Sequence, residues 1–197
     1  MKIIGLTGPT GSGKSTVATV AEENGFFVIN CDSIAREVTE PNSPLLPLLC
    51  EAFGEEILFA DGTLNRKELA KRAFCSKKNT ELLNSIMLPF IAERIKDIIE
   101  NLSADGVEFV LLDAPTLFES GLDSICDLCL AVLCPENIRK KRIIERDNLT
   151  EEQADIRLAA SKPDSFYCER TKHILVNDGE LQNFLAQISE KIGELIQ

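Results

Sequence analysis

The sequence predicts a three-layer α/β fold built on a parallel sheet. Short apolar runs rich in Val, Ile, Leu and Phe alternate with helical patterns, as is typical of parallel strands buried on both faces. A glycine-rich loop separates the first run from the first helical pattern, which gives the order strand, loop, helix. We expect strands at Lys2–Thr7, Phe26–Asn30, Val107–Leu112, Asp127–Leu133 and His173–Val176.

The loop after the first strand matches a phosphate-binding pattern. Residues 8–15 read Gly-Pro-Thr-Gly-Ser-Gly-Lys-Ser, which is G-x-x-x-x-G-K-[ST]. Glycines let backbone N–H groups turn toward an anion, and Lys14 is placed to reach the β- and γ-phosphates. The Ser15 hydroxyl is placed to ligate Mg²⁺. A glycine turn that happens to precede a helix is the alternative, but both flanks favour a nucleoside triphosphate site.

Composition and charge exclude several classes of protein. The 197 residues suit one domain, and 44% apolar with 27% charged residues is globular rather than disordered. The first apolar run leads straight into the glycine loop, so we expect no signal peptide. No apolar stretch approaches the length of a membrane span, which favours a cytoplasmic protein without a membrane partner. The net charge of −11 argues against nucleic acid as a partner.

Cysteines and basic residues need local explanations. Cys126 and Cys129 form a CxxC, but a second ligand pair is missing and His173 is the single histidine, so a buried strand with small apolar cysteines is favoured over zinc. Two basic clusters could attract a polyanionic substrate, although a solvated helix face is the ordinary interpretation of each. They comprise Arg66, Lys67, Lys71, Arg72, Lys77 and Lys78, and Arg139, Lys140, Lys141, Arg142 and Arg146.

Two helical stretches interrupt the alternation. The first holds segments at Ser43–Phe53, Arg66–Cys75 and Glu81–Leu102, where Pro89 predicts either two helices or one kinked helix. The second, at about 135–170, contains a capping box beginning at Thr150. Small-molecule kinases have this architecture, in which one insertion holds the acceptor and the other closes over ATP to exclude water. We expect one domain with a core at about 1–32, 105–137 and 171–197, an acceptor-binding insertion at about 33–104 and a lid at about 138–170.

Asp32 follows the second strand, where ligands bind in open α/β sheets. A carboxylate at this place can accept the proton of an acceptor hydroxyl as it attacks the γ-phosphate. The alternative is an N-cap for a helix that begins near Ser33, since Asp is favoured at that position. Position alone leaves both roles open.

Asp113 ends an apolar strand, which matches a Walker-B carboxylate that reaches Mg²⁺ through water. Glu119 could touch the metal or the acceptor, and a surface role is equally compatible with its position. Arg142 and Arg146 share one face of a helix and could stabilise charge on the transferring group. Surface ion pairs with Asp147 and nearby glutamates are the alternative for both arginines.

Taken together, these segments resemble the dephospho-CoA kinase family over nearly the whole chain. The segments Asp-x-Ile-Ala-Arg and Asp-Gly-Thr-Leu-x-Arg discriminate well, whereas the glycine loop does not. The similar segments are residues 6–16, 28–36, 61–66, 113–119, 142–147 and 174–179.

The resemblance implies a P-loop NTPase fold and transfer of the ATP γ-phosphate to the ribose 3′-hydroxyl of dephospho-CoA, with Mg²⁺. It implies that Asp32 is the catalytic base, aided by Lys14, and that Arg142 and Arg146 belong to a lid over ATP. Asp32, Arg36, Arg66 and Glu119 would contact the acceptor, and Ser15 and Asp113 the metal. ATP would be bound by Gly8, Gly11, Ser12, Gly13, Lys14, Ser15 and Thr16.

The chain departs from the family pattern at Leu88, Asn30, Thr116 and Ser161, which puts acceptor affinity and lid detail in question. Another small-molecule kinase, acting on a nucleoside monophosphate or a metabolite, is the nearest alternative. A nucleotide-switch module is more distant, because no Asn-Lys-x-Asp motif occurs. We expect a monomer or a small homo-oligomer.

Overall fold

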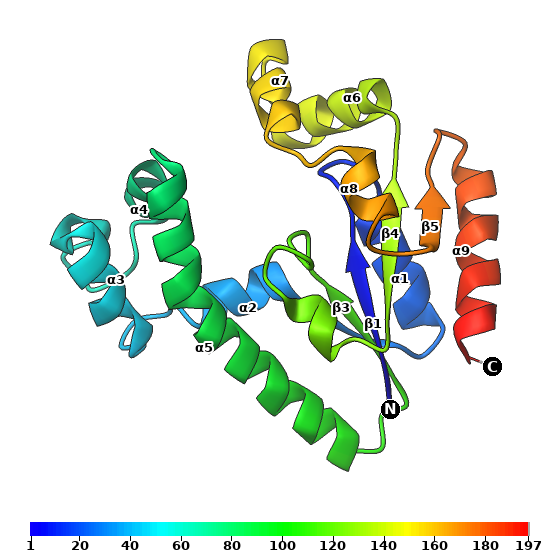
Figure 1. Cartoon of the computed structure of the whole chain (residues 1–197), viewed down its shortest axis with the longest axis horizontal. Coiled ribbons are helices and arrows are strands. Elements are labelled where there is room, and N and C mark those ends of the chain that lie inside the picture. The colour runs from blue at the N-terminus through cyan, green and yellow to red at the C-terminus, as the bar shows by residue number, and fades with distance from the viewer. Residues whose placement is uncertain (197) are drawn as a thin grey trace. The chain divides into compact units, whose positions relative to one another are not determined.

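Five strands form one sheet in the order β2-β3-β1-β4-β5 (Figure 1). The structure is a computed structural model that describes residues 1–196. The pairs β1–β3, β1–β4 and β4–β5 are parallel, which confirms the predicted parallel α/β class. Each predicted strand is present, with bounds that differ by at most two residues: β1 Lys2–Thr7, β2 Phe27–Asn30, β3 Phe109–Asp113, β4 Leu128–Leu133 and β5 His173–Val176.

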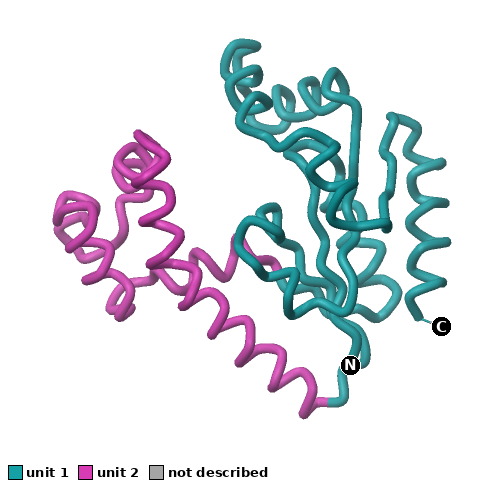
Figure 2. The backbone as a smooth tube through the Cα atoms, viewed as in Figure 1, with its two compact units in different colours: residues 1–29, 106–197 teal, residues 30–105 magenta. Residues whose placement is uncertain are grey.

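The chain divides into two compact units (Figure 2). Unit 1 joins Met1–Ile29 to the residues from Gly106 onward, and unit 2 is Asn30–Asp105. Unit 2 thus nearly coincides with the insertion expected at about 33–104, whereas the expected lid region belongs to unit 1. The roles assigned to these two segments stay predictions.

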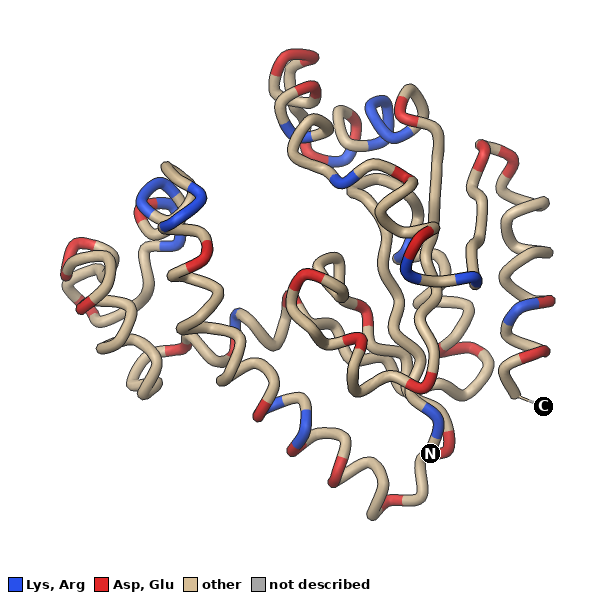
Figure 3. The backbone as a smooth tube through the Cα atoms, in the orientation of Figure 1, with Lys and Arg blue, Asp and Glu red and all other residues tan. Residues whose placement is uncertain are grey.

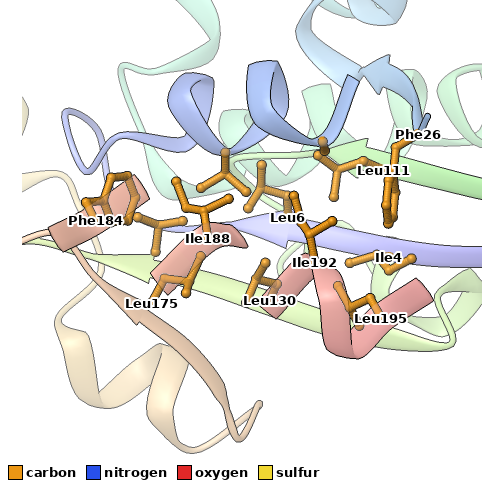
Figure 4. Close-up of a cluster of buried hydrophobic side chains, with 13 residues drawn as sticks. Ile4, Leu6, Phe26, Leu111, Leu130, Leu175, Phe184, Ile188, Ile192 and Leu195 are labelled. Carbon is orange, nitrogen blue, oxygen red and sulfur yellow. The ribbon is translucent and has the colours of Figure 1, made fainter. Parts of the chain in front are cut away.

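One face of the sheet is covered by α1 (Lys14–Glu23) and α9 (Leu181–Ile196). Alternate strand residues point to this face, as the pleat requires, and Ile4 and Leu6 of β1 are fully buried there. Figure 4 shows the apolar side chains that fill the space between the strands and these helices. The cluster also contains Val17, Ala21, Phe26, Leu111, Leu130, Val132, Leu175, Phe184, Ile188, Ile192 and Leu195.

The opposite face packs against η2 (Leu122–Ile125), α8 (Asp164–Cys168) and the loop after β3. Gly5 of β1 faces this side, and a Cβ there would lie 2.7 Å from Leu117 Cδ2 and 2.9 Å from Cys126 Sγ. Only a residue without a side chain admits such close packing. Tyr167 of α8 packs with Ala131 and Leu133, and burial raises the pKa of its phenol to about 12.

The helices α6 (Glu136–Asp147) and α7 (Glu151–Ala159) form a hairpin in unit 1. Ile143 of α6 packs against Ala154 and Leu158 of α7. Thr150 caps α7 through the predicted capping box, in which its side chain accepts from the Gln153 backbone. Across the hairpin, Lys140 pairs with Glu151 and Asp155, and Arg157 pairs with Asp147.

Unit 2 is helical, apart from an isolated bridge between Leu58 and Leu64. Its helix α5 is continuous over 28 residues with Pro89 inside it. The two-helix alternative is therefore wrong. The helices of unit 2 are α2 Cys31–Glu37, α3 Leu45–Phe53, η1 Glu55–Ile57, α4 Arg66–Ala73 and α5 Lys77–Ala104.

Among the described residues, none of the seven cysteines forms a disulfide. Cys126 and Cys129 are half-buried rather than buried, and a hydrogen bond from Cys126 lowers the pKa of the Cys129 thiol. Within residues 1–196, no group of three or more His, Cys, Asp or Glu side chains could hold a metal ion. The described helices include none that is both long and apolar enough to cross a membrane.

Candidate active site

The glycine loop connects β1 to α1 and adopts a conformation that only glycines take easily. Gly8, Gly11 and Gly13 have φ values of +141°, +76° and +108°. A Cβ on Gly8 would lie 2.3 Å from the Val132 carbonyl oxygen, so the loop presses directly on the end of β4. Gly13 is the N-cap of α1, whose first turn has no side-chain cap. The N–H groups at the start of a helix point along its axis and favour an anion there.

Lys14, the first residue of α1, folds back over this loop. Its Nζ donates to the Gly8 carbonyl at 2.7 Å and to the Pro9 carbonyl at 3.2 Å. The ammonium group therefore lies at the loop, where its charge adds to the positive end of the helix dipole. Its contact with the β- and γ-phosphates stays a prediction.

The interior of the loop also contains a buried hydroxyl. Ser12 is fully buried, and its Oγ has no hydrogen-bond partner among the described residues. A Cβ on Gly8 would lie 3.2 Å from this oxygen, so the hydroxyl faces into the loop. A buried hydroxyl without a partner costs about 1–3 kcal/mol of stability. An anionic ligand in the loop would supply the missing acceptor.

Hard oxygen donors suited to Mg²⁺ occur beside the loop. Ser15 is exposed in the first turn of α1, and with Thr16 it also lines an open groove of about 490 Å³ between α1 and α9. Asp113 ends β3 and pairs in register with Leu6, two residues before Gly8. The Ala114 backbone continues this ladder by donating to the Leu6 carbonyl at 3.0 Å, which fixes Asp113 beside the entry to the loop.

Arg142 of α6 lies at the same loop. Its Nη1 donates to the carbonyls of Gly11 at 3.3 Å and Ser12 at 3.4 Å, and its Nη2 donates to Asn177 Oδ1 at 3.0 Å. Close packing supports this placement, because a Cβ on Gly11 would lie 3.1 Å from the Arg139 carbonyl oxygen. The helix α6 is therefore seated on the loop through both backbone and side chain.

Arg146 makes different contacts, although it shares α6 with Arg142. Its Nε donates to Asp147 Oδ1 at 2.7 Å and its Nη2 to Asp147 Oδ2 at 2.8 Å. Together with Arg157, it holds the pKa of the Asp147 carboxyl below its usual range. The ion-pair alternative thus describes Arg146 in this structure, whereas Arg142 contacts the glycine loop.

Figure 3 shows basic residues gathered on α6 in unit 1 and on α4 in unit 2. The interpretation of the α6 cluster as a solvated face is wrong for Arg139. Its side chain is buried, its Nε donates to the Cys134 carbonyl at 3.0 Å, and its Nη1 has no partner among the described residues. This bond ties the first turns of α6 to the end of β4.

Asp32 lies in the first turn of α2 and is exposed. The helix begins at Cys31, and its N-cap is Asn30, whose side chain accepts from the Ser33 backbone at 2.9 Å. The capping alternative for Asp32 is therefore wrong, because Asn30 has that role. The Asp32 carboxylate is stabilised near the positive end of α2 without being used as its cap.

Arg36 and Arg66 come together in unit 2. Arg66 Nη2 donates to the Arg36 carbonyl at 3.2 Å and to Thr39 Oγ1 at 2.8 Å. Arg36 is four residues after Asp32 on α2, so these two side chains share a helix face. Unit 2 thus holds a carboxylate and two exposed guanidinium groups that are neighbours in the chain or by hydrogen bonding.

Two residues at the site had no role assigned from the sequence. Asn177, which follows β5, and Arg139 are both buried beside the loop and α6. A polar residue directly after an apolar strand was a usable signal for Asn177. For Arg139 the usable signal was its spacing, because it lies four residues before the buried Ile143 on α6. Glu119 is exposed in the loop after β3.

Comparisons with known proteins agree on one family. A family model for dephospho-CoA kinase matches residues 2–183. A dephospho-CoA kinase of Corynebacterium efficiens is 42% identical over 193 residues, which cover 98% of this chain and 96% of that protein. The crystal structure of TT1252 from Thermus thermophilus has a TM-score of 0.82 at 28% identity and covers 98% of this chain and 97% of its own. The dephospho-CoA kinase from Campylobacter jejuni has a TM-score of 0.73 at 25% identity, with 99% and 98% covered.

Proposed function

The chain belongs to the dephospho-CoA kinase family, and from this premise we propose that it transfers the γ-phosphoryl group of ATP to the ribose 3′-hydroxyl of dephospho-CoA, giving coenzyme A and ADP. One observation supports the donor half directly: Lys14 bonds to the Gly8 carbonyl inside a loop of glycines with positive φ. The acceptor half rests on membership of the family.

The residues of unit 1 bind the donor in this proposal. The backbone N–H groups of residues 8–16 surround the phosphates, and Lys14 neutralises their charge. Arg142 stabilises charge on the transferring group, because its guanidinium already lies against the loop. The hairpin of α6 and α7 excludes water, which would otherwise accept the phosphoryl group.

Ser15 and Asp113 would hold Mg²⁺ together with phosphate oxygens and water. Few protein ligands are typical of Mg²⁺ at a nucleotide, which fits the lack of a larger acidic cluster among residues 1–196. Held there, the ion would supply positive charge that offsets the charge of the phosphates.

Asp32 acts as the base in this proposal. The acceptor oxygen forms a bond to the γ-phosphorus, the bond from that phosphorus to the bridging oxygen breaks, and the hydroxyl proton passes to Asp32. The carboxylate is exposed and is not used as a cap, which leaves it available. Arg36 and Arg66 would hold the anionic acceptor, with Glu119 as a further contact. Arg146 would act in the lid after releasing Asp147.

We place the reaction in the cytoplasm, a reducing compartment in which cysteines ordinarily stay thiols, as the seven described cysteines do. A monomer or a small homo-oligomer stays a prediction.

An acceptor panel tests the proposal. ADP release is followed with ATP and, in turn, dephospho-CoA, AMP, UMP, gluconate and shikimate, and the product is identified by mass spectrometry. We expect coenzyme A from dephospho-CoA, with turnover on the other acceptors near the rate of ATP hydrolysis. Faster transfer to any other acceptor would assign the chain to a different kinase reaction. The variant Lys14→Ala controls for contaminating kinases.

A further inference from the structure

Asn177 lies directly behind the glycine loop, and its side chain is 4% exposed. Its backbone N–H donates to the Leu133 carbonyl at 2.8 Å, which extends the pairing of β4 with β5 by one residue. The backbone of Asn177 is therefore held by both β4 and β5. This pairing fixes the position from which its side chain reaches the loop.

The amide of Asn177 joins the loop to Arg142. Its Nδ2 donates to the Ser12 carbonyl at 2.8 Å, and its Oδ1 accepts from Arg142 Nη2 at 3.0 Å. A carboxamide supplies a donor and an acceptor on one planar group, so both partners are satisfied at once. A buried amide in such a bridge is costly to remove, because each partner loses a hydrogen bond away from water.

The glycine loop also packs tightly against the Asn177 amide at Gly13. A Cβ on Gly13 would lie only 2.3 Å from Asn177 Nδ2, and Gly13 has a φ of +108°. Glycine is thus required at position 13 for its space as well as for its conformation. The amide fills the volume behind the last loop residue before α1.

The contacts of Arg142 show what Asn177 contributes to its position. The other contacts of the Arg142 guanidinium are all made by Nη1. They are the Gly11 carbonyl at 3.3 Å, the Ser12 carbonyl at 3.4 Å and Cys134 Sγ at 3.4 Å. Nη2 donates to Asn177 Oδ1 at 3.0 Å. This bond fixes the rotation of the guanidinium plane, which determines where a second N–H points.

We infer that Asn177 is a positioning residue for the donor phosphates, which acts by orienting Arg142 against the glycine loop. In this role it acts through Arg142 rather than by contacting the phosphates or the acceptor. The inference rests on the proposed function only in taking ATP as the donor. It concerns unit 1 alone, and no acceptor is needed to test it.

A double-mutant cycle on nucleotide binding separates this role from a merely structural one. The probe is adenylyl imidodiphosphate, a non-hydrolysable ATP analogue, with Mg²⁺ in titration calorimetry. We expect Asn177→Ala to weaken binding about tenfold when Arg142 is present and less than twofold in an Arg142→Ala background. Equal losses in both backgrounds would overturn the inference, since they would show that Asn177 acts without Arg142.

The isosteric variant Asn177→Asp gives a second cycle with the opposite pattern, and it replaces the first if the alanine variant does not fold. Its carboxylate keeps an acceptor for Arg142, so we expect a loss of less than threefold when the arginine is present. With Arg142→Ala, the uncompensated negative charge repels the phosphates, and we expect a loss above tenfold. The same loss in both backgrounds would again contradict the inference.

Asn183→Ala is the matched control, because Asn183 is exposed on α9 and should leave binding unchanged. The outcome is independent of the acceptor. Failure to phosphorylate dephospho-CoA would contradict the proposed function. Additive losses of nucleotide affinity in the cycle would contradict only the role of Asn177.

Discussion

Asp32 and Asn30 are two residues apart, and substitutions can separate the capping role of Asn30 from the base role that we propose for Asp32. Asn30 caps α2 through the Ser33 backbone at 2.9 Å, and Asp32 is exposed in the first turn. We expect Asp32→Asn to remove activity while leaving the fold nearly intact. We expect Asn30→Ala to weaken the fold while leaving the base in place.

The magnitudes follow from the two roles. Loss of a general base typically lowers turnover about 10²-fold or more, which is about 2.7 kcal/mol of transition-state free energy. The same change removes a charge near the positive end of an exposed helix, which is worth about 0.3–1 kcal/mol of stability. Loss of the Asn30 cap costs about 1 kcal/mol, or a fall of about 2–4 °C in Tm for a chain of this size.

The assay measures turnover by coupled ADP release at saturating ATP and dephospho-CoA, with ATP affinity by calorimetry and Tm by circular dichroism. Asp32→Asn should keep the ATP affinity of the wild type, since the base does not bind the donor. Turnover of Asp32→Asn within threefold of the wild type would refute the reasoning. So would a loss of turnover in Asn30→Ala as large as that in Asp32→Asn.

Three further changes test the loop and the α6–α7 hairpin. Lys14→Ala should lower turnover about 10²-fold or more with dephospho-CoA affinity unchanged, because the ammonium serves the donor phosphates; a collapse of acceptor affinity in calorimetry would show that the donor and acceptor sites are misassigned. Gly8→Ala should abolish ATP binding and lower urea stability by more than Gly25→Ala, since a Cβ on Gly8 meets the Val132 carbonyl at 2.3 Å whereas one on Gly25 meets nothing within 4 Å; equal losses would contradict the steric argument. Asp147 has a lowered pKa, so its ion pairs contribute their full stabilisation at pH values above the ordinary pKa of a carboxyl. This contribution is lost as the pH falls from there through the lowered pKa of Asp147. The Tm difference between wild type and Asp147→Asn should then be constant from pH 5 to 8 and shrink below about pH 4; a difference that grows in acid would be the wrong sign.

The strands and the loop were predictable because each depends on local sequence. An apolar run such as Val110–Leu112 has one stable destination, the interior of a parallel sheet. The positions of Gly8 and Gly13 follow from a pattern in which glycine is needed for positive φ. Lys14 and Asp113 followed from these two features, because the end of a strand determines where its last side chain lies.

The residues that were not predicted are buried through contacts that form only in the folded chain. Arg139 lies on the helix face of Ile143 and is buried with its Nε bonded to the Cys134 carbonyl, although a basic side chain is ordinarily expected in solvent. Asn177 meets Ser12 across 165 positions of sequence. The capping role considered for Asp32 was wrong for another reason. Asn30 and Asp32 both have good capping side chains, and Asn30 is the cap because β2 ends at that residue.

Both cations at the loop are held by its carbonyl groups, and this has a consequence for catalysis. Lys14 bonds to Gly8 and Pro9, and Arg142 bonds to Gly11 and Ser12. The loop therefore uses its carbonyl oxygens to hold two positive charges close to the proposed phosphate site. A triphosphate that enters offers stronger acceptors than these carbonyls, and each cation needs only to exchange one oxygen for another. Because the charges are already partly desolvated and oriented, little reorganisation remains for the reaction itself, which is the condition under which fixed charges stabilise a transition state most.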